Sequence, residues 1–181
     1  MSAESSPGLV RVFYALWPSP SIARELALHG KALTVETGGR SMRPETVHLT
    51  LAFLGDVASD RLPELIALPP TVTGVPFGLD LDRLGVWSRN GIGWAAPSEP
   101  PEALIALQSA LEGWLRTRGF APDRRAFRPH ITLVRNAAGD WPLARIPAVE
   151  WDVTDFVLVR SNRNGGGASY EVLARFSLTS H

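Results

Sequence analysis

Residues 43–54, RPETVHLTLAFL, and residues 127–134, FRPHITLV, carry the same signature: a histidine and a threonine two positions apart within an apolar run. Runs of branched and aromatic residues of this length favour β-strands. Successive side chains of a strand point to opposite faces, so in each copy the histidine and the threonine share one face while the flanking aliphatic side chains take the other. Each strand therefore presents an imidazole beside a hydroxyl.

Arg-Pro pairs at residues 43–44 and 128–129 precede both signatures, and each signature strand follows a predicted helix and a short connection. This repetition indicates an internal duplication. Two related lobes would pack with pseudo-two-fold symmetry and place the signature strands side by side at the floor of a central groove. We therefore predict a bilobal α+β fold, with mainly antiparallel sheets lining the groove and helices outside.

The remaining strands are predicted from apolar runs bounded by glycine, proline or polar residues. All the predicted strands together are residues 9–16, 40–54, 77–82, 84–87, 92–96, 127–134, 153–160 and 169–178. Residues 55–56 should end the first signature strand. A turn at residues 88–91 should close a hairpin, and a polar loop at residues 161–167 should separate the last two strands.

Two long helices are predicted from apolar residues at helical spacing. The first begins at Pro20, with Ser19 as its N-cap, and ends a few residues before Gly38. The second covers residues 101–118, and a short helix is expected at residues 59–68.

The chain has 181 residues, of which 45% are hydrophobic, and this fits one compact domain or two small lobes with a shared core. We expect residues 1–8 to form a disordered tail and residues 9–181 a single bilobal domain. With no cysteine, disulfides, thiolate nucleophiles and cysteine zinc sites are excluded. No apolar run is long enough for a membrane span and the start MSAESSPG does not resemble a secretory signal, so we expect a cytoplasmic monomer with no membrane partner.

The formal net charge is zero, and Lys31 is the only lysine among 18 basic residues. Arginine suits planar phosphate contacts, although a GC-rich genome gives the same bias without functional meaning. Zero net charge argues against the coating of long nucleic acids, because that affinity comes from neutralising many phosphates. A local basic groove that holds one end of a nucleic acid stays open.

Only four histidines are present, and two of them, His48 and His130, fall in the same motif. Each alone also fits a strand residue bonded to backbone. Together, one neutral imidazole could take a proton from water while the other, protonated, gives one to a departing oxygen, because an ordinary pKa of about 6.5 makes both states accessible. Thr50 and Thr132 would donate hydrogen bonds to phosphate oxygens, where negative charge develops.

Metal catalysis is the main competing chemistry, because two histidines can ligate zinc or iron. A catalytic zinc usually has three protein ligands, and each signature strand supplies only one. Asp80 and Asp82 lie on the polar face of an alternating strand, and we interpret them as solvated. We therefore predict neither a metal nor another cofactor. Serine-elbow, Walker and dinucleotide-binding patterns are absent from the sequence.

With these motifs, the chain is identified as a member of the 2H phosphoesterase superfamily, and it closely resembles the RNA 2′,3′-cyclic phosphodiesterase family, also called 2′-5′ RNA ligases. The resemblance covers nearly the whole chain. The matching stretches are VRVFYALWP, RPETVHLTLAFLGDV, LDRLGVW, FRPHITLVRN, FVLVRS and YEVLARFSL. The resemblance implies a bilobal fold, metal-independent chemistry and opening of a 2′,3′-cyclic phosphate to a terminal 2′-phosphate, with 2′-5′ ligation as a secondary reverse reaction.

The resemblance also implies roles for individual residues. His48 would be the proton donor to the leaving 3′ oxygen and His130 the base for water, with Thr50 and Thr132 holding the phosphate, although the near-symmetry of the motifs leaves the order of these roles open from sequence alone. The further positions that match binding residues of the family are Arg135 for phosphate and Phe53, Trp94 and Tyr170 for stacking on base or ribose. Each of these four also fits an ordinary surface or core position.

Three functions stay open at this point. The first is a phosphodiesterase acting on RNA ends or on nucleoside 2′,3′-cyclic phosphates. The second is a module that binds a phosphorylated RNA end without turnover. The third is a phosphoesterase of the same superfamily with another cyclic nucleotide or a 2′-5′ oligonucleotide as substrate, because substrate choice depends on the loops at residues 88–91 and 161–167.

Overall fold

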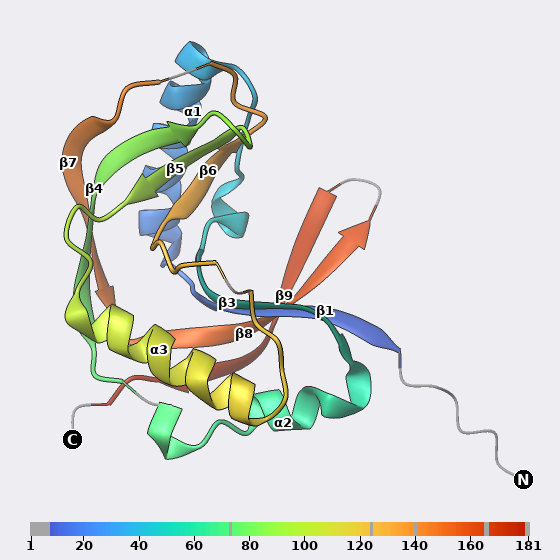
Figure 1. Cartoon of the computed structure of the whole chain (residues 1–181). Coiled ribbons are helices and arrows are strands. Elements are labelled where there is room, and N and C mark those ends of the chain that lie inside the picture. The colour runs from blue at the N-terminus through green and yellow to red at the C-terminus, as the bar shows by residue number, and fades with distance from the viewer. Residues whose placement is uncertain (1–7, 73, 124, 140, 165–166, 180–181) are drawn as a thin grey trace, which may run out of the picture.

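The computed structural model describes residues 8–72, 74–123, 125–139, 141–164 and 167–179 (Figure 1). The helices are α1 (Pro20–Thr37), α2 (Leu62–Ile66) and α3 (Glu102–Thr117), and short 3₁₀ turns lie at Pro44–Thr46, Ser59–Arg61 and Pro70–Val72. The strands are β1 (Leu9–Leu16), β2 (Arg40–Ser41), β3 (Leu49–Ala58), β4 (Phe77–Trp87), β5 (Ile92–Ala96), β6 (Ile131–Arg135), β7 (Ala144–Val153), β8 (Asp155–Asn164) and β9 (Gly167–Ser177). The tail expected at residues 1–8 lies outside the described residues except for Gly8. In the part of the chain described, no helix combines the length and the apolar character needed to cross a bilayer.

The described strands form one antiparallel sheet in the order β7-β4-β5-β6-β3-β1-β8-β9, with β2 beside β6. Its centre is the pair of signature strands, β3 and β6, which meet where Leu49 lies opposite Ile131. We call β3, β1, β8 and β9 the first lobe and β6, β5, β4 and β7 the second lobe. The predicted pseudo-two-fold α+β arrangement is thus confirmed, and the two lobes share one continuous sheet.

Each long helix packs on the lobe to which its preceding strand does not belong. Helix α1 follows β1 of the first lobe but packs against β5, β6 and β7 of the second, whereas α3 follows β5 and packs against β3 of the first (Figure 1). A Cβ atom on Gly30 of α1 would lie 2.9 Å from the carbonyl oxygen of Leu133, so the helix approaches β6 more closely than a side chain permits. Each signature strand is therefore supported by a helix from the other half of the chain.

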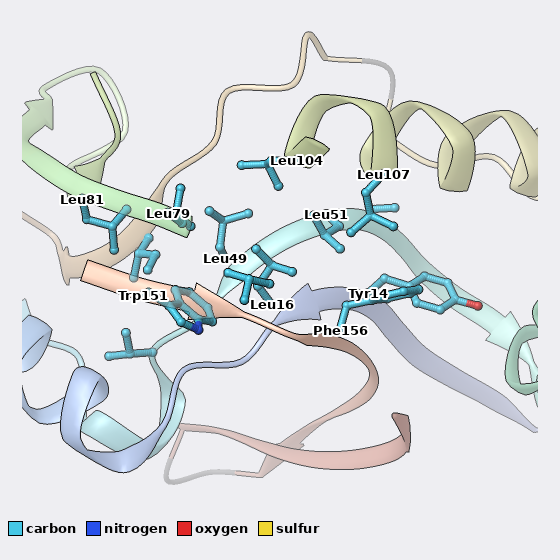
Figure 2. Close-up of a cluster of buried hydrophobic side chains, with 14 of the residues drawn as sticks. Tyr14, Leu16, Leu49, Leu51, Leu79, Leu81, Leu104, Leu107, Trp151 and Phe156 are labelled. Carbon is cyan, nitrogen blue, oxygen red and sulfur yellow. The ribbon is translucent and has the colours of Figure 1, made fainter. Parts of the chain in front are cut away.

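The core lies on the helix-covered face of the sheet. Figure 2 shows Leu49 and Leu51 of β3 beneath Leu104 and Leu107 of α3, and all four are buried. Because strand side chains alternate, the histidines and threonines of the two motifs point to the other face, which we call the histidine face. This face carries a second, smaller cluster made of Phe13, Ala15, Val157 and Val159.

Both long helices are confirmed. The Ser19 hydroxyl accepts a hydrogen bond from the Ile22 amide at 3.5 Å and caps α1 as predicted. The helix continues to Thr37, so Gly38 is its C-cap and does not lie some residues beyond its end. Helix α3 begins and ends within one residue of its predicted bounds, and the short helix expected at residues 59–68 is present as a 3₁₀ turn followed by α2.

The prediction of one strand over residues 40–54 is wrong. The segment forms β2 and β3, separated by a 3₁₀ turn that begins at Pro44, whose ring cannot donate to a strand ladder. The Thr46 hydroxyl fixes this turn by donating to the Arg43 carbonyl at 2.8 Å. Strand β3 then continues past residues 55–56, its expected end, because Gly55 adopts a φ of 71° where the pairing with β1 shifts register.

Other strand predictions also differ from the structure, and the two strands expected at residues 77–82 and 84–87 are one strand, β4. Strand β6 begins at Ile131, so residues 127–130 are not strand. Strand β7 was not predicted, because Pro147 and exposed polar residues make it typical of an edge strand with a weak pattern. The polar loop expected at residues 161–167 is largely strand, since β8 and β9 pair from Asp155–Ser177 to Asn164–Gly167.

Tyr14→Phe is expected to lower the free energy of unfolding by about 1–2 kcal/mol. The fully buried Tyr14 hydroxyl donates to the Leu65 carbonyl at 2.6 Å and so ties α2 to β1. Phenylalanine would keep the ring in place but leave that buried carbonyl without a donor. Urea unfolding measures the change, and Tyr170→Phe, which removes a partly exposed hydroxyl, is the matched control. Equal losses in the two variants would contradict the importance of this hydrogen bond.

Candidate active site

The pair Leu49–Ile131 sets the geometry of the site. Both side chains are fully buried in the core. Residues one step to either side of an antiparallel pair also lie opposite each other, so each motif histidine faces the threonine of the other motif. Continued by one residue in each direction, this register brings His48 opposite Thr132 and Thr50 opposite His130. All four side chains are half-buried and point to the histidine face, with a two-fold arrangement about one pair of residues.

Both imidazoles are held in the same way. Nδ1 of His48 lies 2.8 Å from the carbonyl oxygen of Thr46, and Nδ1 of His130 lies 2.7 Å from that of Arg128. A backbone carbonyl can only accept, so Nδ1 carries the proton in both rings. In the neutral form each Nε2 is then a free acceptor for a proton. The same carbonyl, two residues before the histidine, fixes the tautomer in both motifs.

Aromatic rings surround His48. Trp17 is stacked on it at 5.2 Å between centroids with an interplanar angle of 1°, Phe13 lies at 4.9 Å, and the edge of Tyr170 contacts it at 5.2 Å. Among the described residues His130 has one aromatic neighbour, Trp87, which meets it edge-on at 4.6 Å. These contacts restrict the rotation of both imidazoles, and the stacked Trp17 ring covers one face of His48.

The electrostatics of the site keep both imidazoles neutral near pH 7. The pKa of His48 is lowered to about 4, chiefly by burial; the positive charges of Arg135 and of protonated His130 act in the same direction, and the hydrogen bond to the Thr46 carbonyl opposes them. Burial also lowers the pKa of His130, and the charge of Arg125 acts in the same direction. The coupling between the two histidines agrees with their placement on one face.

A cavity of about 520 Å³ opens beside His48 on the first lobe. Its lining combines His48 and Thr50 with aromatic rings and with arginines. The aromatic rings are those of Phe13, Phe53 and Tyr170, and the arginines are Arg11, Arg40, Arg43 and Arg135. A larger cavity of about 870 Å³ surrounds the start of α1, but neither motif histidine lines it. Of the four motif residues, only His48 and Thr50 line the smaller cavity, and His130 and Thr132 lie outside its lining. The smaller cavity is therefore the candidate site for the substrate, beside the first motif.

Two of the lining arginines are held close together without a counter-ion. Arg40 of β2 lies directly opposite Arg135 of β6, and neither forms an ion pair with a described residue. The approach of these strands requires Gly39, because a Cβ atom there would lie 2.5 Å from the Arg135 carbonyl oxygen. Like charges in facing positions destabilise a sheet, so an anion in the cavity would relieve a cost that the fold imposes.

The further predicted binding residues do not all gather in one place. Arg135, Phe53 and Tyr170 line the cavity, and Phe53 is 38% exposed. Trp94 does not line it: this residue lies on β5, opposite Thr132, and its ring contacts Trp87.

Sequence reasoning missed several residues of the site. They are Phe13, Trp17, Trp87, Arg11, Arg40 and Arg43. Strand alternation could have placed Phe13 on the histidine face, because its neighbours on β1 point into the core. No sequence signal places Trp17 or Trp87, which reach the histidines from the ends of other strands.

One of the acidic side chains considered with the histidines has another partner in the structure. In the described ranges, no group of three or more histidine, aspartate or glutamate side chains is placed to hold a metal ion. Asp82, considered above as a possible ligand, accepts hydrogen bonds from the Ser98 amide and hydroxyl, both at 2.6 Å. Its expected interpretation as a solvated carboxylate is therefore incomplete, because it caps a loop.

Comparison with known proteins places this geometry among phosphoesterases. The family profile described as "LigT like Phosphoesterase" matches residues 16–94 and again residues 95–168, so each match contains one signature. The RNA 2′,3′-cyclic phosphodiesterase of Escherichia coli is 34% identical over 93% of this chain and 97% of its own. The enzyme of the same name from Thermus thermophilus is 31% identical over 93% and 90%.

Solved structures agree with these relatives. Escherichia coli LigT complexed with 3′-AMP superposes with a TM-score of 0.86 and 30% identity over 95% of this chain and 99% of that one. The same protein complexed with phosphate has a TM-score of 0.81 at 31% identity, over 96% and 99%.

Proposed function

Since the chain belongs to the LigT-like phosphoesterase family, we propose that it is an RNA 2′,3′-cyclic phosphodiesterase, which hydrolyses the cyclic phosphate at an RNA end to a 2′-phosphate. The observation that carries this proposal is the meeting of two histidine–threonine pairs on one face of the sheet about Leu49–Ile131. Displacement at phosphorus needs a base on one side and an acid on the other. Two imidazoles with free Nε2 atoms supply both.

In the proposed reaction, Nε2 of His130 takes a proton from a water molecule as the water oxygen bonds to phosphorus. The bond between phosphorus and the 3′ oxygen breaks, and protonated His48 gives its Nε2 proton to that oxygen. The products are a 2′-phosphate and a free 3′-hydroxyl. Thr50 and Thr132 donate hydrogen bonds to the non-bridging oxygens, which gain negative charge in the transition state.

The lowered pKa of His130 fits its role as base, whereas the lowered pKa of His48 means that its role as acid depends on the substrate. A neutral His130 is ready to act as a base near pH 7, whereas His48 must gain a proton before it can act as an acid. The phosphodiester supplies the cause, because a bound anion favours the charged form of a neighbouring imidazole. Arg135 and Arg40 balance the remaining negative charge. Substrate binding and proton uptake by His48 are thus coupled.

The cavity suits the terminal nucleoside. Its volume of about 520 Å³ lies within the range of small-molecule sites, and the rings of Phe13, Phe53 and Tyr170 offer faces for a base or ribose. The same acid–base pair with exchanged roles would join a 5′-hydroxyl to the cyclic phosphate, so we propose 2′-5′ ligation as a secondary activity. We also propose that the enzyme acts as a cytoplasmic monomer, which sedimentation and fractionation would test.

A synthetic RNA that ends in a 2′,3′-cyclic phosphate tests the proposal when it is incubated with the protein in EDTA. The expected product carries a 2′-phosphate, identified by chromatography against 2′- and 3′-phosphate standards, and the rate is unchanged by the chelator. Saturable binding without product would favour a binding module instead. Loss of activity in EDTA would assign the reaction to a metal, and a 3′-phosphate product would show that the other ester bond is broken.

A further inference from the structure

We infer that the RNA chain upstream of the cyclic phosphate crosses the histidine face of the second lobe, where Arg83 and Arg145 hold a backbone phosphate. This inference rests on the proposed function and extends it, because it makes RNA chains, rather than single nucleotides, the preferred substrate class. The upstream phosphates are absent from a nucleoside 2′,3′-cyclic phosphate, so only a chain can use such a subsite.

The sheet register places the arginines in line with His130. Ile131 lies opposite Ala95, so Ala96 is one step along, beside His130. Ala96 faces Arg83 on β4, and Arg83 faces Arg145 on β7. With strands about 4.8 Å apart, the Cα atom of Arg83 lies about 10 Å from that of His130, within reach of a phosphate next to the reacting one.

Alternation along β4 settles which face the arginines occupy. A register shift between Leu81 and Arg83 interrupts this alternation, so the face is assigned from the residue after it: Leu84 is buried in the core, and its neighbour Arg83 therefore points to the histidine face. Helix α1 packs against β5, β6 and β7 on the opposite face, and none of the described helices lies over this one (Figure 1). The face that leads away from His130 across the second lobe is therefore the one that carries Arg83.

Arg83 lacks any partner in the described part of the chain. Its Nε atom is buried without a hydrogen bond, whereas its terminal nitrogens are not among the buried unpartnered atoms. Arg145 opposite it adds a second positive charge, and neither belongs to an ion pair, in contrast to Arg61 with Glu64 or Arg175 with Asp155. Facing like charges and an unsatisfied buried donor are both costly, and a bound phosphate would offset them.

The nearest carboxylate does not supply this charge balance. Asp82 is held by two hydrogen bonds from Ser98, which lower its pKa, and the charge of Arg145 lowers it further. Asp82 thus lies near Arg145 but forms no ion pair with it among the described contacts. Arg83 keeps its charge facing the open side of the sheet.

Aromatic rings lie next to His130 on the same lobe as these arginines. The indole of Trp94 lies over Gly85, where a Cβ atom would come within 2.3 Å of the ring, and its Nε1 is buried without a partner. Trp87 contacts both Trp94, at 5.4 Å, and His130, at 4.6 Å. Aromatic faces beside arginines are typical of sites for single-stranded nucleic acid, since bases stack on the rings while cations hold the backbone.

The test compares two substrates with one variant. Arg83→Gln is expected to lower kcat/KM about tenfold for a four-nucleotide RNA that ends in a 2′,3′-cyclic phosphate, and to leave kcat/KM for a nucleoside 2′,3′-cyclic phosphate unchanged. Arg145→Gln should act in the same direction. Arg24→Gln is the charge-matched control, because Arg24 is exposed on α1, which packs on the other side of the sheet. Urea unfolding should show no loss of stability in Arg83→Gln, because no partner is lost and a facing like charge is removed.

Two further measurements place the contact on a phosphate. The slope of log kcat/KM against log salt for the tetranucleotide should fall by about 0.7 in Arg83→Gln. In a second set of substrates, a neutral methylphosphonate replaces one phosphate linkage of the RNA at a time. Replacement at one linkage should lower kcat/KM of the wild type, and replacement at the same linkage should leave kcat/KM of Arg83→Gln unchanged. The inference would be overturned if Arg83→Gln changed kcat/KM equally for both substrates, or for neither substrate, while the wild type turned both of them over. Absence of turnover with both substrates in wild type would instead overturn the proposed function.

Discussion

His130→Ala is expected to lower kcat/KM for an RNA 2′,3′-cyclic phosphate by about 10²–10⁴-fold, the range typical of a lost general acid or base. The Nδ1 proton of His130 is fixed on the Arg128 carbonyl, so only Nε2 can accept a proton from water. Alanine removes that acceptor, and water attack then lacks a base. Initial rates in EDTA with varied substrate measure the loss.

His48→Ala should cause a loss of similar size, because the leaving oxygen then departs without a proton. The double variant should be little worse than either single variant, since the two imidazoles act as one unit. His29→Ala, which removes a histidine from α1, is the matched control and should keep wild-type activity. Near-normal turnover in either single variant, with the fold intact by urea unfolding, would rule out the paired mechanism.

The sequence predicted the shared face of the motifs for a simple physical reason. Side chains on a strand repeat every two residues, so the spacing of His48 and Thr50 and of His130 and Thr132 fixes their relative direction without knowledge of the fold. Scarcity of histidine made the repetition informative. The helices followed from their 3.6-residue period and from the cap at Ser19.

Other features of the site depend on contacts between distant segments. The exchange of α1 and α3 between lobes, and the single pair Leu49–Ile131 that joins them, are set by packing and not by any local pattern. The 3₁₀ turn that begins at Pro44 has a local cause, but it was not predicted because the apolar run after it favoured one continuous strand over residues 40–54. Trp17 and Trp87 lie at strand ends, where alternation no longer determines direction, so their contacts with the histidines could not be predicted.

Lowering the pH from 7 to 5 is expected to destabilise wild type more than His48→Gln. The difference between the free energies of unfolding of the two proteins should change by about 2 kcal/mol in favour of the variant. The pKa of His48 is lowered to about 4 in the folded protein by burial, against about 6.5 in an unfolded chain. Above pH 6.5 the imidazole is neutral in both states and the shift has no effect. Between pH 6.5 and 4 the unfolded chain binds a proton at His48 and the native state does not. The free energy of unfolding of wild type therefore falls as the pH is lowered through this range.

Urea unfolding of wild type and His48→Gln at pH 7, 6 and 5 measures this difference, with His29→Gln as the control for removal of a histidine. Inorganic phosphate adds a sharper test, because an anion beside His48 favours its protonated form and so stabilises the native state at pH 5. Phosphate should therefore recover part of the acid loss in wild type and little in His48→Gln. Parallel pH curves for the two proteins would mean that His48 titrates normally, and proton uptake on substrate binding would then have no basis.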